Sequence, residues 1–393
     1  RLDDNPALDH AVRSGARICP VFIHDTLSPG LRAPGGAQAW MLHHALEALA
    51  RMFAELGVEL VIRSGPAGDV LPDLVREAGA EAIFWNRRYG AGEREVDASL
   101  KIRLRADGMQ VSSFNANLLP EPARLTTAEG NPYRVFSPFW RSFLRQGEPR
   151  TPVRSPDRIE GAGKVGSLAI AELKLLPEKP DWAGGLRQFW RIGGDAALDR
   201  LASFLHTGLT GYAKGRDVPG CEHVSRLSPY LRFGMISPYR IWHDARASEA
   251  PEADKEKFLK ELGWREFSWH LLFHFPHLYW RNFDGRFDSF PWKSDSPHLE
   301  AWKRGRTGYP IVDAGMGELW RTGYMHNRVR MIAASFLVKH LLVDWREGEK
   351  WFWDTLVDGD NANNPASWQW VSGCGADAAP YFRVFNPILQ GEK

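Results

Sequence analysis

One stretch near the C-terminal end organises the chain: Asp358-Gly359-Asp360-Asn361-Ala362-Asn363-Asn364-Pro365-Ala366-Ser367-Trp368-Gln369-Trp370. It places two carboxylates, three asparagine amides and two indoles between a helical pattern and a glycine-rich segment. Asp, Asn, Gly and Pro interrupt periodic structure, so we predict a loop that the flanking helices hold in place. Loops on a rigid scaffold often carry functional residues. A surface turn followed by two packed indoles is the alternative.

Length and composition narrow the class of protein. A chain of 393 residues is too long for one ordinary core, so two domains are expected. The net charge of +2 is too small for a basic coat, so any contact with nucleic acid must come from a local patch. The 17 tryptophans fit an aromatic core, an electron-transfer chain or a base-stacking surface.

The cysteines and the apolar runs predict the compartment. Cys19, Cys221 and Cys374 lie far apart and form no CxxC pair, which argues for a reducing compartment, here the cytoplasm, and against a disulfide framework or a cysteine-ligated cluster. We expect no metal ion. No apolar run reaches the length of a membrane span and no signal peptide is visible, so no membrane is expected as a partner.

The first third of the chain alternates between strand and helix patterns. Strands are predicted at residues 17–23, 58–62, 82–85 and 109–111, with apolar helical stripes at 42–56, 70–75 and 96–104. This alternation predicts an α/β domain over residues 1–120, with a parallel sheet covered by helices on both faces. No G-x-G-x-x-G or P-loop follows a strand, which argues against those nucleotide sites.

The remainder divides into a connector and a helical domain. Residues 121–180 are rich in Pro, Arg and Gly and have poor periodicity, so we predict an interdomain linker that lies over the surface. Helical patterns run almost throughout residues 181–393, which predicts an all-α second domain.

Three groups of residues in the helical domain point to chemistry. Ser228 and Pro229 suit the N-cap and the first position of a helix, which is either an anion site or a plain cap. Glu261 and Trp264 are three residues apart on one helix face, where a carboxylate can accept an amide hydrogen bond while the indole stacks under a base. A salt bridge from Glu261 to a neighbour is the alternative.

A third helix face carries Asn327, Arg330 and Met331, which are three and four residues apart. This arrangement is compatible with a binding surface. Arg330 can equally pair with Asp358 and bind no ligand.

These motifs together resemble the photolyase/cryptochrome flavoprotein family. The likeness covers nearly the whole chain, and the matching segments are residues 308–314, 325–331, 344–349, 368–370 and 378–387. Residues 363–368 resemble the bacterial class III branch, close to plant cryptochromes. Relative to the family, both ends of the chain look truncated.

The resemblance implies FAD, bent into a U, inside the helical domain. Tyr212, Val224, Ser225, Arg226, Leu227 and Ser228 would hold its phosphates, while Arg330, Asp358 and Asp360 would flank its isoalloxazine and ribose. Asn364 would face flavin N5. In this family an Asn there accompanies the fully reduced flavin that repair needs, and an Asp accompanies the neutral radical of plant cryptochromes.

The resemblance also implies a pocket for a cyclobutane pyrimidine dimer. Its residues would be Glu261, Trp264, Asn327, Met331 and Trp370, while Arg216, Arg265, Arg328 and Arg383 would contact DNA phosphates. The related (6-4) enzymes carry histidines at the places of Asn327 and Met331, because their chemistry needs an acid. The absence of these histidines favours the cyclobutane substrate, flipped out of the duplex.

Two further sites follow from the family. Trp368, Trp345 and Trp292 match the triad that carries an electron from the surface to excited flavin, although each can also be a core residue. Trp40, His43, Glu93 and the loop after Trp85 are where an antenna methenyltetrahydrofolate would sit. An empty or purely structural antenna site is the alternative.

We therefore expect a monomeric, light-driven DNA repair lyase that uses reduced FAD on DNA carrying cyclobutane pyrimidine dimers. A cryptochrome-type blue-light receptor without repair activity is the competing hypothesis. A generic flavin reductase is disfavoured, because no nicotinamide-binding glycine loop is present.

Overall fold

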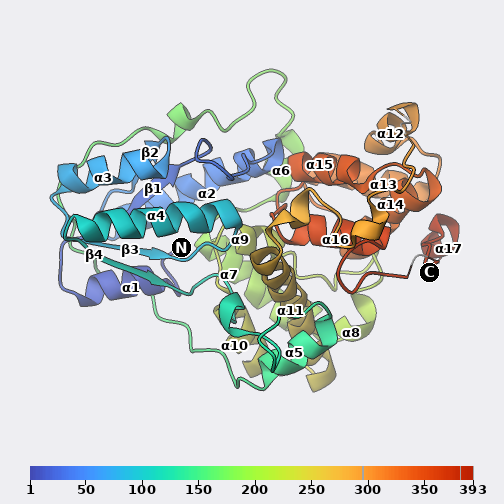
Figure 1. Cartoon of the computed structure of the whole chain (residues 1–393), viewed down its shortest axis with the longest axis horizontal. Coiled ribbons are helices and arrows are strands. Elements are labelled where there is room, and N and C mark those ends of the chain that lie inside the picture. Colours follow the sequence, from blue (N-terminus) through green and yellow to red (C-terminus); the bar gives the residue numbers. More distant parts are fainter. Residues whose placement is uncertain (294–295, 381, 393) are drawn as a thin grey trace.

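The computed structural model describes all residues of the chain except 294, 295, 381 and 393 (Figure 1). Tyr381, which belongs to the family-like motif at 378–387, therefore lies outside the described residues. An α/β part occupies one end of the molecule and a helical part the other (Figure 1).

The α/β part consists of α1 (Pro6–Arg13), β1 (Val21–His24), α2 (Gly36–Glu55), β2 (Val61–Ser64), α3 (Ala67–Ala78), β3 (Ala82–Asn86), α4 (Ala91–Ala106) and β4 (Gln110–Phe114). The helical part consists of α5 (Phe136–Leu144), α6 (Gly184–Phe189), α7 (Gly194–Ser203), α8 (Tyr212–Gly215), α9 (Ser228–Arg232), α10 (Pro238–Ala247), α11 (Glu252–His274), α12 (Ser296–Lys303), α13 (Pro310–Thr322), α14 (Asn327–Ser335), α15 (Trp345–Thr355), α16 (Asn363–Ser372) and α17 (Pro387–Gly391). Short 3-10 or π turns join several of these helices.

The strands are parallel, as the alternation of patterns predicted. β1 pairs with β2 and β3 pairs with β4, so the sheet consists of two parallel pairs in place of one continuous sheet. The strand predicted at 17–23 begins only at Val21. Pro20 has no N–H to donate to a ladder, and Ile18 forms an isolated bridge with Gly161.

Helix α2 belongs to both halves of the molecule. Trp40 and Met41, near its start, are buried in the large core of the helical part. Leu46 and Phe53, further along, are buried in the core of the α/β part. Each fully buried large apolar side chain contributes about 1.5–3 kcal/mol to folding, so this one helix connects the two cores energetically.

The segment 121–180 corrects the linker prediction. It contains α5, in which Phe136, Phe139 and Phe143 are buried in the core of the helical part. Their spacing of three and four residues is helical, and α5 packs on α11. Residues 136–144 therefore belong to the helical part, although the chain that follows runs along the outside of the molecule (Figure 1).

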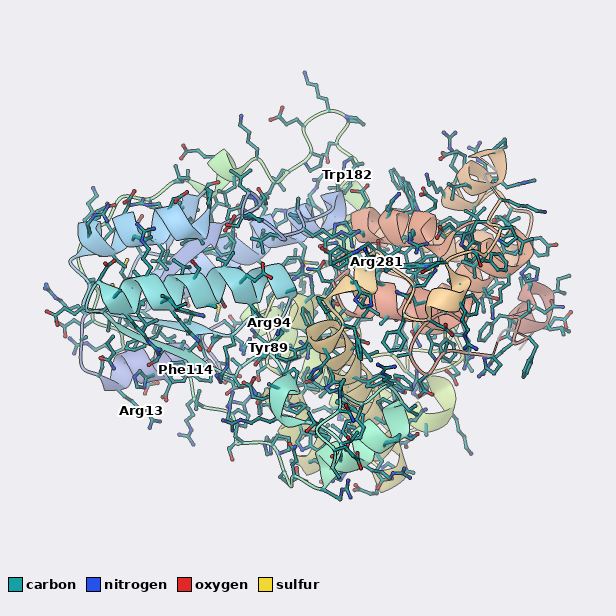
Figure 2. All side chains as sticks on the ribbon, viewed as in Figure 1. Arg13, Tyr89, Arg94, Phe114, Trp182 and Arg281 are labelled. Carbon is teal, nitrogen blue, oxygen red and sulfur yellow. The ribbon has the colours of Figure 1, made fainter. Side chains whose placement is uncertain are left out.

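Arginines also connect the two parts. Figure 2 shows Arg94 near the start of α4, where α4 approaches α11. Its Nη2 donates to the Phe273 carbonyl at 3.1 Å, and its guanidinium lies 4.0 Å from the Phe273 ring centre. Among the described residues, no helix combines the length and apolar character needed to cross a membrane.

Candidate functional site

A cavity of about 570 Å³ lies within the helical part. Segments around α8, α9, α11, α14 and α16 line it. It brings together all the residues predicted for flavin, lesion and phosphate contact: Tyr212, Arg216, Val224, Ser225, Arg226, Leu227, Ser228, Glu261, Trp264, Arg265, Asn327, Arg328, Arg330, Met331, Asp358, Asp360, Asn364, Trp370 and Arg383. Trp368 also lines it.

An ion pair fixes one corner of the cavity. Arg330 Nη1 and Nη2 donate to the two carboxylate oxygens of Asp358 at 3.1 and 2.8 Å, and Arg330 Nε donates to the Met325 carbonyl at 2.7 Å. Burial opposes the charge of Arg330, but Asp358 outweighs it and leaves the pKa of the guanidinium above its ordinary value. The pairing foreseen as an alternative is thus present, and both residues still line the cavity.

Ser228 corrects the capping prediction. The N-cap of α9 is Leu227, and Ser228 lies inside the first turn. The Ser228 hydroxyl donates to Asp358 Oδ2 at 2.6 Å and so extends the ion-pair network. A helix of five residues has only a short dipole, so the anion-binding role predicted for its start has no support from the helix itself.

Arg200 holds the loop that precedes α9 through hydrogen bonds to two of its carbonyl groups. Its Nη2 donates to the Val224 carbonyl at 2.8 Å and its Nε to the Ser225 carbonyl at 2.7 Å. Arg226 has a φ of 53°, a left-handed conformation that is uncommon for a residue with a side chain. The loop is therefore held in one shape, with its carbonyls engaged by Arg200.

The start of α16 is organised by Asp360. Its Oδ1 accepts the backbone N–H groups of Ala362 and Asn363 at 2.8 and 2.5 Å, and its Oδ2 accepts from the Asn363 amide at 2.7 Å. These bonds satisfy donors that a helix start leaves free. Asn364, one residue further on, is buried and lines the cavity, and its amide donates to Glu349.

The outer side of the cavity is rich in ion pairs. Glu261 forms a salt bridge with Arg216 and lies 3.5 Å from Lys257 Nζ, so the salt-bridge alternative for this carboxylate is present. Arg328 pairs with Asp217 at 2.7 Å. Two of the predicted phosphate contacts, Arg216 and Arg328, thus already have carboxylate partners.

The other two predicted phosphate contacts differ from each other. Arg265 pairs with the buried Glu266 at 2.6 Å. Burial raises the pKa of Glu266 to about 7, although Arg265 opposes the rise. Arg383 is exposed, with its guanidinium 5.8 Å from the Trp370 ring centre. Arg383 is the more accessible of the two for an external phosphate.

An aromatic stack supports the side of the cavity that was predicted to bind the lesion. The Trp264 ring lies on Phe136 of α5, with centroids 3.7 Å apart and planes 8° from parallel. On the facing helix, Asn327 Nδ2 lies 4.0 Å from Met331 Sδ, so the two side chains share a face as predicted. Trp264 is therefore a fixed flat surface, of the kind on which a base can stack.

Comparisons with known proteins agree with this geometry. The family model described as DNA photolyase matches residues 1–157, and the one described as FAD binding domain of DNA photolyase matches residues 258–393. A deoxyribodipyrimidine photo-lyase of Agrobacterium fabrum is 51% identical over 397 residues, covering all of this chain and 82% of the relative. The chain belongs to the DNA photolyase family. Cryptochrome-1 of Arabidopsis thaliana is 36% identical over the whole chain, which spans only 59% of that relative.

Solved structures of the photolyase family have the same fold. The crystal structure of a bacterial class III photolyase from Agrobacterium tumefaciens matches with a TM-score of 0.96 and 50% identity, over all of this chain and 81% of the other. A Synechocystis cryptochrome matches with a TM-score of 0.87 and 27% identity, over all of this chain and 83% of the other. The predicted α/β and all-α architecture is confirmed.

The three tryptophans predicted for electron transfer pack in one cluster of the helical part. Trp368 is buried and lines the large cavity, and its ring centre lies 5.0 Å from that of Phe352. Trp345 is fully buried, and its Nε1 donates to Asn282 Oδ1 at 2.9 Å. Trp292 is half-buried at the edge of the cluster. Trp368 and Trp345 are thus buried, and Trp292 is the member of the three that lies nearest the surface.

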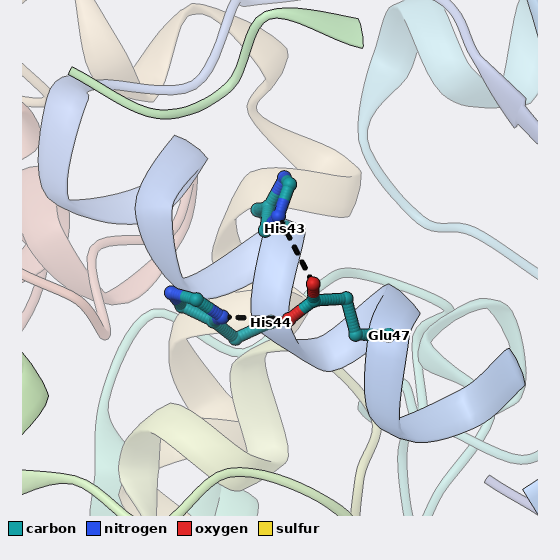
Figure 3. A group of neighbouring side chains, drawn as sticks. All are labelled: His43, His44 and Glu47. Atoms are coloured by element: carbon teal, nitrogen blue, oxygen red, sulfur yellow. Dashed lines mark hydrogen bonds and ion pairs between the residues drawn. The ribbon is translucent and has the colours of Figure 1, made fainter. Parts of the chain in front are cut away.

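The residues predicted for an antenna do not all come together. Figure 3 shows His43 and His44 on α2, both directed at the Glu47 carboxylate, at 3.4 and 2.8 Å. A cavity of about 230 Å³ lies beside them and is lined by Trp40, His44, Glu47, Arg51, Arg187, Trp190 and Ile192. His43 does not line it. Burial lowers the pKa of His43, while Glu47 opposes this effect.

Glu93 lies apart from this small cavity. Its carboxylate accepts the Gly90 N–H at 3.0 Å and so caps its own helix, α4. It is not among the residues that line the cavity beside Trp40. Its observed role is to cap α4, and its predicted antenna role stays a prediction.

Sequence reasoning missed residues that position the site from outside it. Arg200, Glu349 and Phe136 each contact a predicted site residue. The helical spacing of the phenylalanines in α5 could have revealed Phe136. Arg200 and Glu349 act through partners distant in sequence, so no local pattern marks them.

Proposed function

We propose that this chain repairs cyclobutane pyrimidine dimers in DNA by light-driven electron transfer from reduced FAD. One observation carries the proposal: the residues assigned to the flavin and those assigned to the lesion line one cavity. Electron transfer needs the two partners close together. The deoxyribodipyrimidine photo-lyase of Agrobacterium fabrum, 51% identical, supports the same reaction.

The residues present fit FAD. The Asp358–Arg330 pair offers an acceptor and a donor to a polar ring edge, and the anchored loop at 224–228 offers backbone N–H groups and the Ser225 hydroxyl to phosphates. The volume of about 570 Å³ is within the range of cofactor pockets. Bound reduced FAD would supply the electron, when excited by light, and take it back.

The protein's own part is to bind, orient and keep water away. Trp264 would stack under one base of a flipped dimer, and Glu261, paired with Arg216 and Lys257, would accept a hydrogen bond from a base N–H. Asn327 and Met331 would contact the other side. Arg383, the exposed one of the four arginines predicted for phosphate contact, would contact phosphate.

The substrate class is argued from the absence of a histidine acid at Asn327 and Met331. Burial, followed by the charges of Arg330 and Arg216, lowers the pKa of His326 to about 4, so this imidazole next to Asn327 is neutral at pH 7. A (6-4) repair site needs a histidine acid. Asn327 and Met331, which line the cavity and offer no such acid, favour the cyclobutane dimer.

We also propose an antenna at the smaller cavity, with methenyltetrahydrofolate as the chromophore. Two indoles, Trp40 and Trp190, and two guanidinium groups, Arg51 and Arg187, suit an aromatic anion. Its 230 Å³ is less than whole cofactors usually occupy, so only part of the folate would be enclosed. Adding the folate should sensitise FAD to near-UV light, and no fluorescence transfer from folate to flavin would reject this assignment.

Illumination of the reduced protein with dimer-containing DNA tests the main proposal. Thymine absorbance should return in the light and not in the dark, and its failure to return would reject repair. A cryptochrome-type receptor remains the competing function. It would accumulate a blue neutral flavin radical on photoreduction, whereas a repair enzyme should proceed to colourless, fully reduced flavin.

A further inference from the structure

An arginine from the α/β part reaches into the helical part beside the large cavity. Arg32, in the segment before α2, donates from Nη1 and Nη2 to the two carboxylate oxygens of Glu349 at 2.7 and 2.9 Å. Its guanidinium also lies 3.7 Å from the ring centre of Trp353, whose Nε1 donates to the Ala33 carbonyl at 3.0 Å. A bidentate pair stacked on an indole is a geometry that lysine cannot reproduce.

The carboxylate that Arg32 holds also holds Asn364. Glu349 is almost fully buried, with 4% of its side chain exposed. Its Oε1 accepts one hydrogen of the Asn364 amide at 2.8 Å, and its backbone carbonyl accepts the other at 3.1 Å. Within the described part of the chain, no hydrogen bond to Asn364 Oδ1 is present. Both N–H groups are engaged away from the cavity, so Oδ1 is the atom offered to it.

The network fixes this orientation of the amide. Turning the side chain over would place Oδ1 against two acceptors, the Glu349 carboxylate and the Glu349 carbonyl. The carboxylate can repel Oδ1 in this way only while it is held in place beside the amide. Without Arg32, the buried Glu349 carboxylate would lose its bidentate partner and its fixed position, so the Asn364 amide would no longer be held in one orientation.

The exposed oxygen matters for the flavin ring. Reduced flavin carries a hydrogen on N5 and oxidised flavin carries a lone pair there. An amide oxygen facing N5 accepts a hydrogen bond from the reduced form and is repelled by the oxidised form. Its orientation therefore biases the redox equilibrium.

We propose that Arg32 is a positioning residue for the flavin site. By holding the Glu349 carboxylate in place, it keeps the Asn364 carbonyl directed into the cavity, where it would face N5 of bound FAD and favour the reduced form. This inference rests on the proposed placement of FAD in the large cavity. It assigns part of the control of the flavin to the α/β part, which contributes no residue to the lining of that cavity.

The test is the midpoint potential of bound FAD in Arg32→Gln, measured by spectroelectrochemistry. Loss of one oriented hydrogen bond should move the reduced-to-oxidised ratio at fixed potential about twofold to tenfold toward oxidised FAD. Infrared difference spectra between the redox states should also show a changed Asn364 carbonyl band. A potential and band equal to those of the wild type would overturn the proposal.

Arg94→Gln is the matched control. Arg94 also spans the two parts, donates to a carbonyl and stacks on an aromatic ring, but it does not touch Glu349. It should leave the potential unchanged, and an equal shift in both variants would overturn the proposal by showing that any loosened boundary suffices.

If Arg32→Gln fails to fold, Glu349→Gln provides the second measurement. It preserves shape but removes the charge and adds a donor, so the potential should shift in the same direction, and an unchanged potential would reject the mechanism. Wild-type protein that binds no FAD would instead refute the proposed function. Wild-type repair with unshifted variants would refute this inference alone.

Discussion

Replacing Trp264 by alanine should remove recognition of the lesion without removing affinity for DNA. The indole is held flat on Phe136, with 3.7 Å between the ring centres, and its side chain lines the cavity. Stacking of one base on an aromatic side chain contributes about 1–3 kcal/mol. Binding of dimer-containing DNA should therefore weaken by about 5- to 150-fold, at 1.4 kcal/mol for each factor of ten.

Binding of undamaged DNA depends on phosphate contacts, which this change leaves in place. The slope of log affinity against log salt should stay the same for both DNAs, since it counts the phosphates neutralised. Fluorescence anisotropy with labelled duplexes, with and without one dimer, measures both quantities.

Trp140→Ala is the matched control for this prediction. Trp140 packs near the other side of the same phenylalanine, with ring centres 6.1 Å apart, but does not line the cavity. It should lower stability while keeping the ratio of damaged to undamaged affinity. The reasoning fails if Trp264→Ala keeps that ratio, or if Trp140→Ala reduces it as much.

Three further changes test other parts of the site. Asp358→Asn removes the charge that pairs with the half-buried Arg330 guanidinium, so urea unfolding should show a loss of about 1.5–3 kcal/mol and the yellow cofactor should be lost; unchanged stability would contradict this. In Gly348→Ala the added Cβ would clash with the Trp368 ring, so we expect about 1–3 kcal/mol less stability and slower photoreduction. Gly317→Ala, on an open helix face, is the control and should not lower the free energy of unfolding. Glu266 has a folded-state pKa raised from 4.5 to about 7, so stability should fall as pH rises across that window, by on the order of 3 kcal/mol. Urea titrations of Glu266→Gln should lack this slope, and an identical pH profile would contradict the assignment.

Periodicity and loop chemistry were enough to predict much of this molecule from its sequence. The strand at 82–85 and the helical stripe that became α2 follow from local apolar spacing, which the chain satisfies within a few residues. The stretch from Asp358 to Trp370 was predicted as a loop because its residue types break periodic structure, and this was wrong for its second half, since residues 363–370 belong to α16 (Asn363–Ser372). Its role, however, came from resemblance and not from spacing.

What remained hidden depends on contacts between distant segments. Ser228 looks like a cap because its neighbours are a good helix start, yet its hydroxyl bonds to Asp358, 130 residues away. Arg32 and Glu349 are separated by 317 residues, and neither stands in a pattern that names the other. Local rules cannot reveal a partner that only the folded chain supplies.

Helix α2 places its first turns in one hydrophobic core and its later turns in the other. If the chain were cut into an α/β fragment and a helical fragment, Trp40 and Met41 would be exposed to water on the α/β fragment. The core of the helical fragment would have a cavity in their place. The α/β part and the helical part look like separate domains in the backbone trace. Because they share α2, we expect them to unfold together in one cooperative transition. Neither half is an exchangeable module, and grafting either onto a foreign partner would require rebuilding this shared helix.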